Sequence, residues 1–176
     1  MIRIIGAVGK VADVDELLKK ILFVAEKKHV CIQILNADVV YGKVHLVSAA
    51  QHAIRAMKEH RHTMNSLAME VLLYASGERQ IKLGITKIGA KKGTRNVAFV
   101  IIDNIKEIPE ASGRFSDADV TGLLKTLQFL KDDKVLEGDK DTLTKFGITT
   151  KELETVPKEK YGHLILEKVA MVDVIK

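Results

Sequence analysis

Cysteine is nearly absent from this sequence: Cys31 is the only one, and it lies in the apolar stretch VCIQIL. A single thiol excludes an intramolecular disulfide framework and favours a reducing compartment. Long hydrophobic runs are missing too, since no stretch approaches the ~18 apolar residues of a membrane-spanning helix. The N-terminal MIRIIGAVGK lacks the basic region, apolar run and cleavage site of a secretion signal. These absences predict a soluble protein of the cytoplasm that contacts no membrane.

Proline is scarce, and linkers are missing. Both prolines, Pro109 and Pro157, lie in the second half of the chain, and no stretch rich in Pro, Gly or Ser divides the sequence. The 176 residues, 47% hydrophobic and 29% charged, suffice for one packed globular domain and are few for two. We therefore predict a single domain over residues 1–176.

Catalytic motifs are also missing. The stretch GAVGKV (6–11) imitates a phosphate-binding loop, but it has too few residues between its glycines, and Val11 stands where Ser or Thr would hold magnesium. GAKKGT (89–94) lacks the lysine after its second glycine. No G-x-S-x-G nucleophile motif occurs, and the carboxylates of KDDKVLEGDKD lie among lysines, which is typical of a solvated surface. We interpret both glycine stretches as turns and predict no catalytic residue and no cofactor.

Histidine is the remaining candidate for metal chemistry. His60 and His62 form the one tight pair, with Glu59 as the only neighbouring side chain of a ligand type. We interpret them as solvated histidines on a connecting loop. His45 and His52 lie two turns apart on one predicted helix, so they need a third partner to hold one ion. The sequence predicts no metal site.

The positive charge is unevenly spread. The net charge is +5, yet residues 55–95 hold nine Lys or Arg against three Asp or Glu, whereas residues 96–176 hold twelve against fifteen. A basic middle segment is typical of proteins with a phosphate-bearing partner. The alternative is that these lysines only keep the surface solvated.

Hydrophobic periodicity predicts strands interleaved with helices. Strands are expected at residues 2–7, 30–36 and 96–102. Helices are expected at residues 14–25 (capped by Asp13), 42–57, 64–75, 79–88, 117–131 and 142–146, with a longer one after Pro157. Because three helices separate the second strand from the third, a regular βαβ alternation is excluded. We predict a mixed α/β (α+β) fold, with a small, partly antiparallel sheet covered by several helices.

The helix expected at residues 64–75 is apolar on nearly every side, and Glu70 is its only charge. Such a helix lies in the centre of a core or is shared with a partner. A carboxylate in that place needs a cationic partner. Arg61 and Arg79 flank it in sequence, so we predict a structural ion pair with an arginine.

The stretch SLAMEVLLYASGERQIKLGI resembles a pattern in the kinase-binding subunit of the KEOPS complex, the family called PRPK-binding protein in animals. Its most specific part is Glu-Arg-Gln-Ile at 78–81. Gly84 and Ile88 depart from the usual Ala and Phe, which affects the packing of the fourth helix. The resemblance extends over essentially the whole chain, whose length is near that of archaeal members. It includes Ala37, Asp38, Gly42, His45, Leu46, Ala49, Ala53 and Ala56 upstream, and Leu166, Glu167, Lys168, Val169 and Ala170 downstream.

This resemblance implies a function. It implies a non-catalytic subunit that binds the small lobe of the complex's atypical kinase/ATPase subunit and stimulates it. The assembly, whose other subunits are indirect partners, installs threonylcarbamoyladenosine in tRNA. The resemblance also implies that the protein helps to hold the CCA end of tRNA.

Candidate contact residues follow from the charge pattern and the last helix. For tRNA we predict the basic residues His60, Arg61, His62, Arg79, Lys82, Lys91, Lys92 and Arg95. For the kinase we predict Val169, Val172 and Ile175, which alternatively close the core. Two rival functions stay open. One is a standalone RNA-binding module, and the other is an enzyme for phosphorylated metabolites with His45, His52 and Glu70 lining one pocket.

Overall fold

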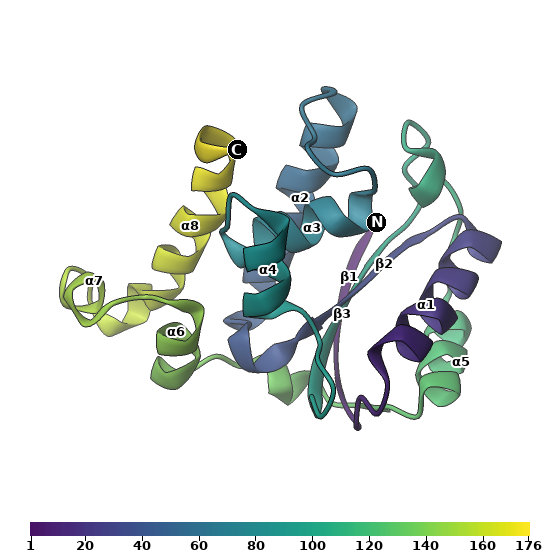
Figure 1. The fold of residues 1–176 in the computed structure, drawn as a ribbon, viewed down its shortest axis with the longest axis horizontal. Coiled ribbons are helices and arrows are strands. Elements are labelled where there is room, and N and C mark those ends of the chain that lie inside the picture. The colour runs from purple at the N-terminus through teal and green to yellow at the C-terminus, as the bar shows by residue number, and fades with distance from the viewer.

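The strands form one sheet in the order β2-β3-β1-β4 in the computed structural model, which describes residues 1–176 (Figure 1). They are β1 (Ile2–Val8), β2 (Cys31–Asn36), β3 (Asn96–Ile102) and β4 (Leu130–Lys131). Every neighbouring pair is antiparallel, with Ile2 opposite Ile102 and Cys31 also opposite Ile102. The predicted mixed α/β fold with a small sheet is confirmed, and its sheet is antiparallel throughout.

Helices cover both faces of this sheet. On one face lie α2 (Gly42–Lys58), α3 (Leu67–Ser76) and α8 (Tyr161–Ile175), whose apolar residues share a core with Ile4 and Val100. The other face carries α1 (Val14–Lys28) and α5 (Asp117–Leu127), which share a second core with Ile5 and Phe99. Because successive strand residues point to opposite faces, both faces of β3 are buried. This explains why VAFVII is continuously apolar rather than alternating.

Local signals in the sequence place the ends of several helices. Asp13 accepts a hydrogen bond from the Glu16 N–H at 2.9 Å and so caps α1, as its spacing predicted. Ser66 caps α3, and that helix ends at Gly77, whose φ of 65° is the left-handed conformation that glycine adopts at little cost. The next helix is α4 (Ile81–Ile88).

The structure corrects three predicted helix boundaries. The third helix begins at Leu67 rather than residue 64, because Ser66 is its cap, and the fourth begins at Ile81 rather than residue 79. The helix expected at 117–131 ends at Leu127. Gln128 ends the helix with a left-handed φ of 60°. Periodicity placed Leu130 on the core face, but Leu130 lies in β4, pairs with Val8 of β1 and is 78% exposed. Pairing with the edge of β1 overrides the helical period there.

The remaining elements are short and lie mostly in the C-terminal third. They are α6 (Lys140–Phe146) and α7 (Thr150–Glu154), of which α7 was not predicted, and the 3₁₀ turns η1 (Ala37–Val39), η2 (Pro109–Ala111), η3 (Asp133–Leu136) and η4 (Lys158–Lys160). In Figure 1, α6, α7 and α8 lie at one end of the molecule, and α1 and α5 lie at the other. No helix has both the length and the apolar character needed to cross a membrane.

Candidate partner-binding face

Helix α3 lies in the centre of the larger core. It packs against α2, α4 and α8, and its residues from Glu70 to Ser76 are all buried. This explains why its sequence is apolar on nearly every side. Its polar groups are therefore cut off from water and need partners inside the protein.

Glu70 has those partners. Its carboxylate accepts hydrogen bonds from the backbone N–H groups of Thr63, at 3.1 Å, and Met64, at 2.9 Å. Its other oxygen lies 2.6 Å from Nζ of Lys176, and that ammonium also lies 4.5 Å from the centre of the Tyr74 ring. The predicted ion pair thus exists, but its cation is Lys176.

Neither predicted arginine is the partner of that carboxylate. Arg61 instead pairs with Glu59, and Arg79 makes no ion pair. The reason is topological. The sequence shows which charges are neighbours along the chain, whereas Lys176 reaches Glu70 from the end of α8, 106 positions away.

A second polar cluster joins α8 to α2 and α3. The Asp173 carboxylate accepts a hydrogen bond from the Tyr74 hydroxyl, and Nη2 of Arg55 donates to it at 2.7 Å. Nδ1 of His52 also lies 2.7 Å from it. Burial raises the pKa of Asp173, but the hydrogen bonds from Tyr74, His52 and Arg55 outweigh it and hold that pKa at about 2. Burial, with the neighbouring Asp173, raises the pKa of Tyr74. The carboxylate therefore stays ionised and fixes α8 in place.

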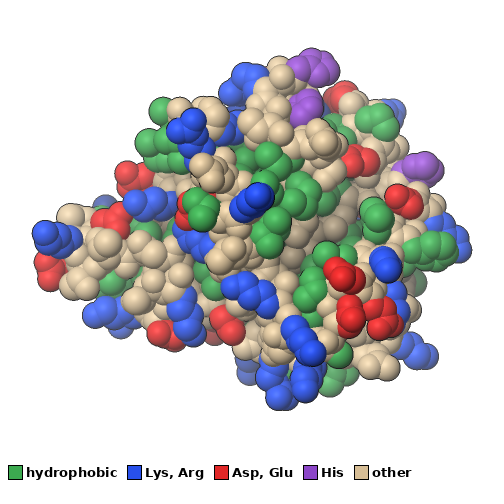
Figure 2. Space-filling view, in the orientation of Figure 1, with side chains coloured by type: hydrophobic (Ala, Val, Ile, Leu, Met, Phe, Trp, Pro, Cys, Tyr) green, Lys and Arg blue, Asp and Glu red, His purple; other side chains and the backbone are tan.

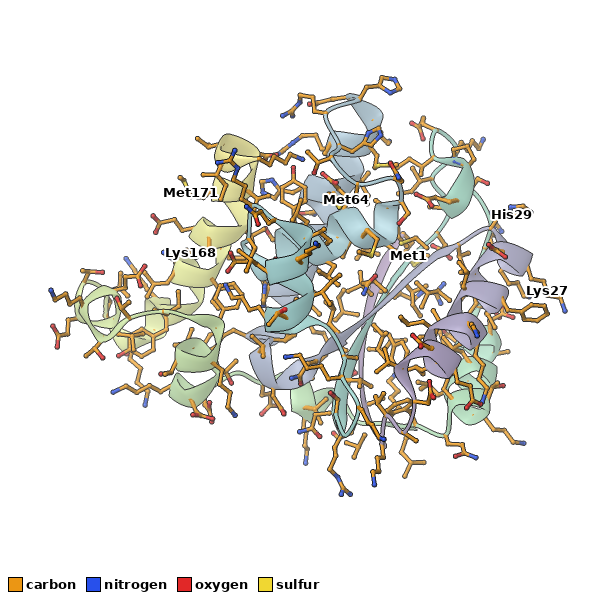
Figure 3. The ribbon with its side chains drawn as sticks, in the orientation of Figure 1. Met1, Lys27, His29, Met64, Lys168 and Met171 are labelled. Atoms are coloured by element: carbon orange, nitrogen blue, oxygen red, sulfur yellow. The ribbon has the colours of Figure 1, made fainter.

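The exposed side of α8 is apolar beside this cluster. Met171 is 42% exposed, Val174 is 74% exposed and Ile175 is 38% exposed. Figure 3 labels Met171 and, one turn earlier on the same helix, Lys168. The i, i+3, i+4 spacing of the three apolar residues was visible in the sequence and could have identified this face. We call Met171, Val174 and Ile175 the α8 patch.

The three kinase-contact residues predicted from sequence have different positions. Ile175 belongs to the α8 patch, whereas Val169 and Val172 are 0% exposed and pack in the larger core. In this conformation the two valines cannot touch a partner. Val169 and Val172 close the core, which was the alternative interpretation of the sequence.

Comparison of the sequence with known proteins identifies the family of this chain. A sequence family described as "Kinase binding protein CGI-121" matches residues 9–172. The chain belongs to this family. The "Regulatory protein Cgi121" of Methanocaldococcus jannaschii is 46% identical over 71 residues, a stretch that spans 40% of this chain and 45% of the relative. The matched stretch is thus less than half of that relative's length, while the family match confirms the resemblance drawn from the sequence.

The basic residues predicted to bind tRNA are exposed but do not form one cluster in this CGI-121 family member. His60, Arg61 and His62 lie on the loop after α2, and Lys91, Lys92 and Arg95 lie on the loop between α4 and β3. These two loops are at opposite ends of the view in Figure 1. Arg79 and Lys82 flank the start of α4, which follows Gly77, a residue packed against the Lys168 side chain of α8. The eight residues therefore occupy three separate places.

The residues proposed for an enzymatic pocket do not converge. Nε2 of His45 lies 2.8 Å from the Ala75 carbonyl oxygen, while His52 contacts Asp173 and Glu70 contacts Lys176. Burial lowers the pKa of His45 to about 4, so its imidazole is neutral at pH 7. None of the three lines the groove of about 860 Å³ beside α1. The structure also brings no three His, Cys, Asp or Glu side chains close enough to hold one metal ion.

Proposed function

We propose that this chain is a non-catalytic regulatory subunit of a KEOPS-type complex. It binds the atypical kinase/ATPase subunit and stimulates it in the formation of threonylcarbamoyladenosine in tRNA. The observation that carries the proposal is the α8 patch. Its three exposed apolar side chains lie on a helix whose position is fixed by the Asp173 cluster and by the ion pair between Lys176 and Glu70. Membership of a kinase-binding family supports it. The name of the Methanocaldococcus relative, "Regulatory protein Cgi121", supports it too.

The α8 patch has the composition of the centre of a protein–protein interface. Met is enriched in such centres, and charged residues are depleted there and gather at the rim. Around the patch, the side chains of Arg55 and Lys168 are 49% and 43% exposed, and each is held by an ion pair within the chain, Arg55 with Asp173 and Lys168 with Glu152, so the rim of the patch is polar. Because Val169 and Val172 fix the helix from below, binding requires little ordering of this surface, which favours affinity.

The decisive experiment replaces the most exposed residue of the α8 patch. Val174→Arg places a charge in the centre of the proposed interface and removes no buried contact. We expect at least a tenfold weaker complex with the kinase subunit of the same organism, measured by calorimetry, and loss of the stimulated ATP hydrolysis. The matched control is Leu130→Arg, because Leu130 is similarly exposed but lies in β4.

The control variant should bind and stimulate as the parent does. Both variants should retain the parent's melting temperature within a few degrees, since neither side chain is buried. Equal binding by Val174→Arg and the parent would remove the α8 patch from the proposal. If the parent binds the kinase subunit but does not stimulate its ATP hydrolysis, the proposed partner stands and the regulatory role is refuted.

Recruitment of tRNA, through its CCA end, is the second part of the proposal. Arg79, Lys82, Lys92 and Arg95 are exposed and make no ion pair within the chain, so their charges are free for phosphates. Their spread over the molecule suits a long backbone rather than one small phosphorylated metabolite. If tRNA binding persists but no kinase complex forms, the chain is instead a standalone RNA-binding module.

A further inference from the structure

A groove of about 860 Å³ lies beside the free edge of the sheet, between α1, β2, the start of α3 and η2. In Figure 1, α3 separates this region from α8, and in Figure 2 the surface is hollowed between the central apolar patch and α1. Leu18 and Leu22 of α1 line the groove and are 45% and 57% exposed. Met69 of α3 lines its other side. The groove is therefore an apolar surface distinct from the α8 patch.

One wall of this groove is an edge strand without the usual protection. Strand β2 pairs only with β3, and its register runs without a bulge from Cys31 to Asn36. Its sequence, CIQILN, contains no charge, proline or glycine. Natural edge strands are commonly blunted by such residues, because an open edge pairs with any extended chain. Only Leu35, near the end of β2, has a further bridge, to Gly89. Cys31, Ile32 and Gln33 form the groove wall and pair with no further strand, whereas the Ile34 carbonyl oxygen already accepts a hydrogen bond from Nε2 of Gln33.

The charges around the groove are mostly negative. Asp15, Glu26 and Glu110 line it, against the single ammonium of Lys19. Asp15 and Glu26 make no ion pair within the chain, so both carboxylates are free to meet a cation. Glu110 accepts a hydrogen bond from the backbone N–H of Leu67 at the start of α3. A rim of this sign repels phosphates and attracts Lys or Arg, which favours a basic peptide over nucleic acid.

We propose that the groove binds an extended segment of a partner protein, rich in apolar and basic residues, which adds to the sheet as a strand beside β2. The backbone of the segment pairs with the edge of β2 at Cys31–Gln33, the part of the strand that lines the groove, and every second side chain enters the apolar groove. Its Lys or Arg side chains meet the carboxylates of Asp15, Glu26 and Glu110. This site is independent of the α8 patch, so the chain can hold two partners at once.

Selection of peptides from a random library tests the proposal. Random seven-residue peptides displayed on phage are selected on the full chain, and the enriched peptides are synthesised and titrated. We expect enriched sequences that alternate apolar residues with Lys or Arg. They should bind Leu22→Lys at least tenfold more weakly than the parent, because that change places a cation in the groove. Leu18→Lys is a second variant with the same expectation.

The matched control is Phe23→Lys. Phe23 is adjacent to Leu22 on α1 and 67% exposed, but it does not line the groove. Binding to this variant should equal binding to the parent. Methylation of alternate backbone nitrogens of the peptide should reduce affinity at least tenfold in one of the two registers, because strand addition depends on backbone hydrogen bonds.

Four results would overturn the proposal. They are selection of no peptide that depends on Leu22 or Leu18, enrichment of acidic sequences, affinity that methylation leaves unchanged in both registers, and binding of a single-stranded RNA oligonucleotide that Leu22→Glu abolishes. The last result would assign the groove to nucleic acid. None of these outcomes bears on the kinase complex, whose own test is Val174→Arg.

Discussion

At the scale of single residues, the ion pair between Lys176 and Glu70 fixes the C-terminal end of α8 to the core. The two side chains are 6% and 0% exposed, and their charged atoms lie 2.6 Å apart. Because both charges are removed from water, each depends on the other and on the N–H groups of Thr63 and Met64. Removing one partner leaves the other charge buried and uncompensated, which is more harmful than removing both.

A double-mutant cycle measures this dependence. Lys176→Met should lower the free energy of unfolding by about 3 kcal/mol, because it leaves Glu70 as an unpaired buried charge. Glu70→Gln combined with Lys176→Met should be more stable than Lys176→Met alone, since Gln still accepts the backbone hydrogen bonds and carries no charge. Urea unfolding at pH 7 provides the values. If the changes in the free energy of unfolding of the two single variants add up to that of the double variant, Lys176 and Glu70 do not stabilise each other.

At the scale of elements, α8 is held by its buried valines and by the Asp173 cluster. Four side chains from three helices meet there: His52 and Arg55 of α2, Tyr74 of α3 and Asp173 of α8. The cluster contributes stability only while Asp173 is ionised. Since its folded pKa of about 2 is below the ~3.9 of an unfolded Asp, this contribution is full above about pH 4 and is lost as the pH falls towards 2.

Replacement of this aspartate by asparagine tests that pH window. Asp173→Asn should lower the free energy of unfolding by roughly 2 kcal/mol at pH 7, and the difference from the parent should shrink between pH 4 and pH 2. Denaturant titrations at several pH values provide the comparison. Glu167→Gln, an exposed change on the same helix, is the control and should stay within about 0.5 kcal/mol throughout. A difference that does not vary with pH would refute the role of the ionised carboxylate.

The sequence predicts these elements unevenly, for physical reasons. Local signals suffice for β3, whose apolar run is continuous, and for the start of α1, where Asp13 and Glu16 form a cap. They fail at β4, because Leu130 continues a helical period that only the edge of β1 interrupts. Contacts between distant positions leave no local signal. For this reason neither Lys176 as the partner of Glu70 nor the groove beside β2 could be predicted from the sequence.

At the scale of the whole molecule, the proposed contacts lie on separate surfaces. The loops that hold His60–His62 and Lys91–Arg95 are at opposite ends of Figure 1, with the start of α4 between them. The α8 patch is near the end of α8, and the β2 groove is on the other side of α3. A tRNA that meets all three basic places must extend along the molecule, so each group should weaken binding in part rather than abolish it.

The doubly changed variant Lys91→Glu, Lys92→Glu tests this extended contact. It should weaken tRNA binding about tenfold at moderate salt and reduce the slope of log affinity against log salt, because fewer counterions are released. Filter binding at several salt concentrations measures both quantities. Lys19→Glu, Lys20→Glu on α1 is the control and should leave the slope unchanged. Identical affinity and slope at low salt for the parent and Lys91→Glu, Lys92→Glu would remove the loop between α4 and β3 from the RNA contact.

The order of the strands in the sheet has a consequence for synthesis on the ribosome. Strand β1 emerges first, yet Ile2 pairs with Ile102, and β2 also pairs with β3. At roughly 5–20 residues per second, both early strands wait on the order of ten seconds for their shared neighbour. Helix α1 needs no distant partner to begin forming, so it is available to shield Ile5 and Ile34 before β3 arrives. The opposite faces of β1 and β2, which include Ile4 and Leu35, stay uncovered together with the unpaired strand edges. The nascent chain therefore exposes apolar surface during much of its translation, and in this interval a chaperone is most needed.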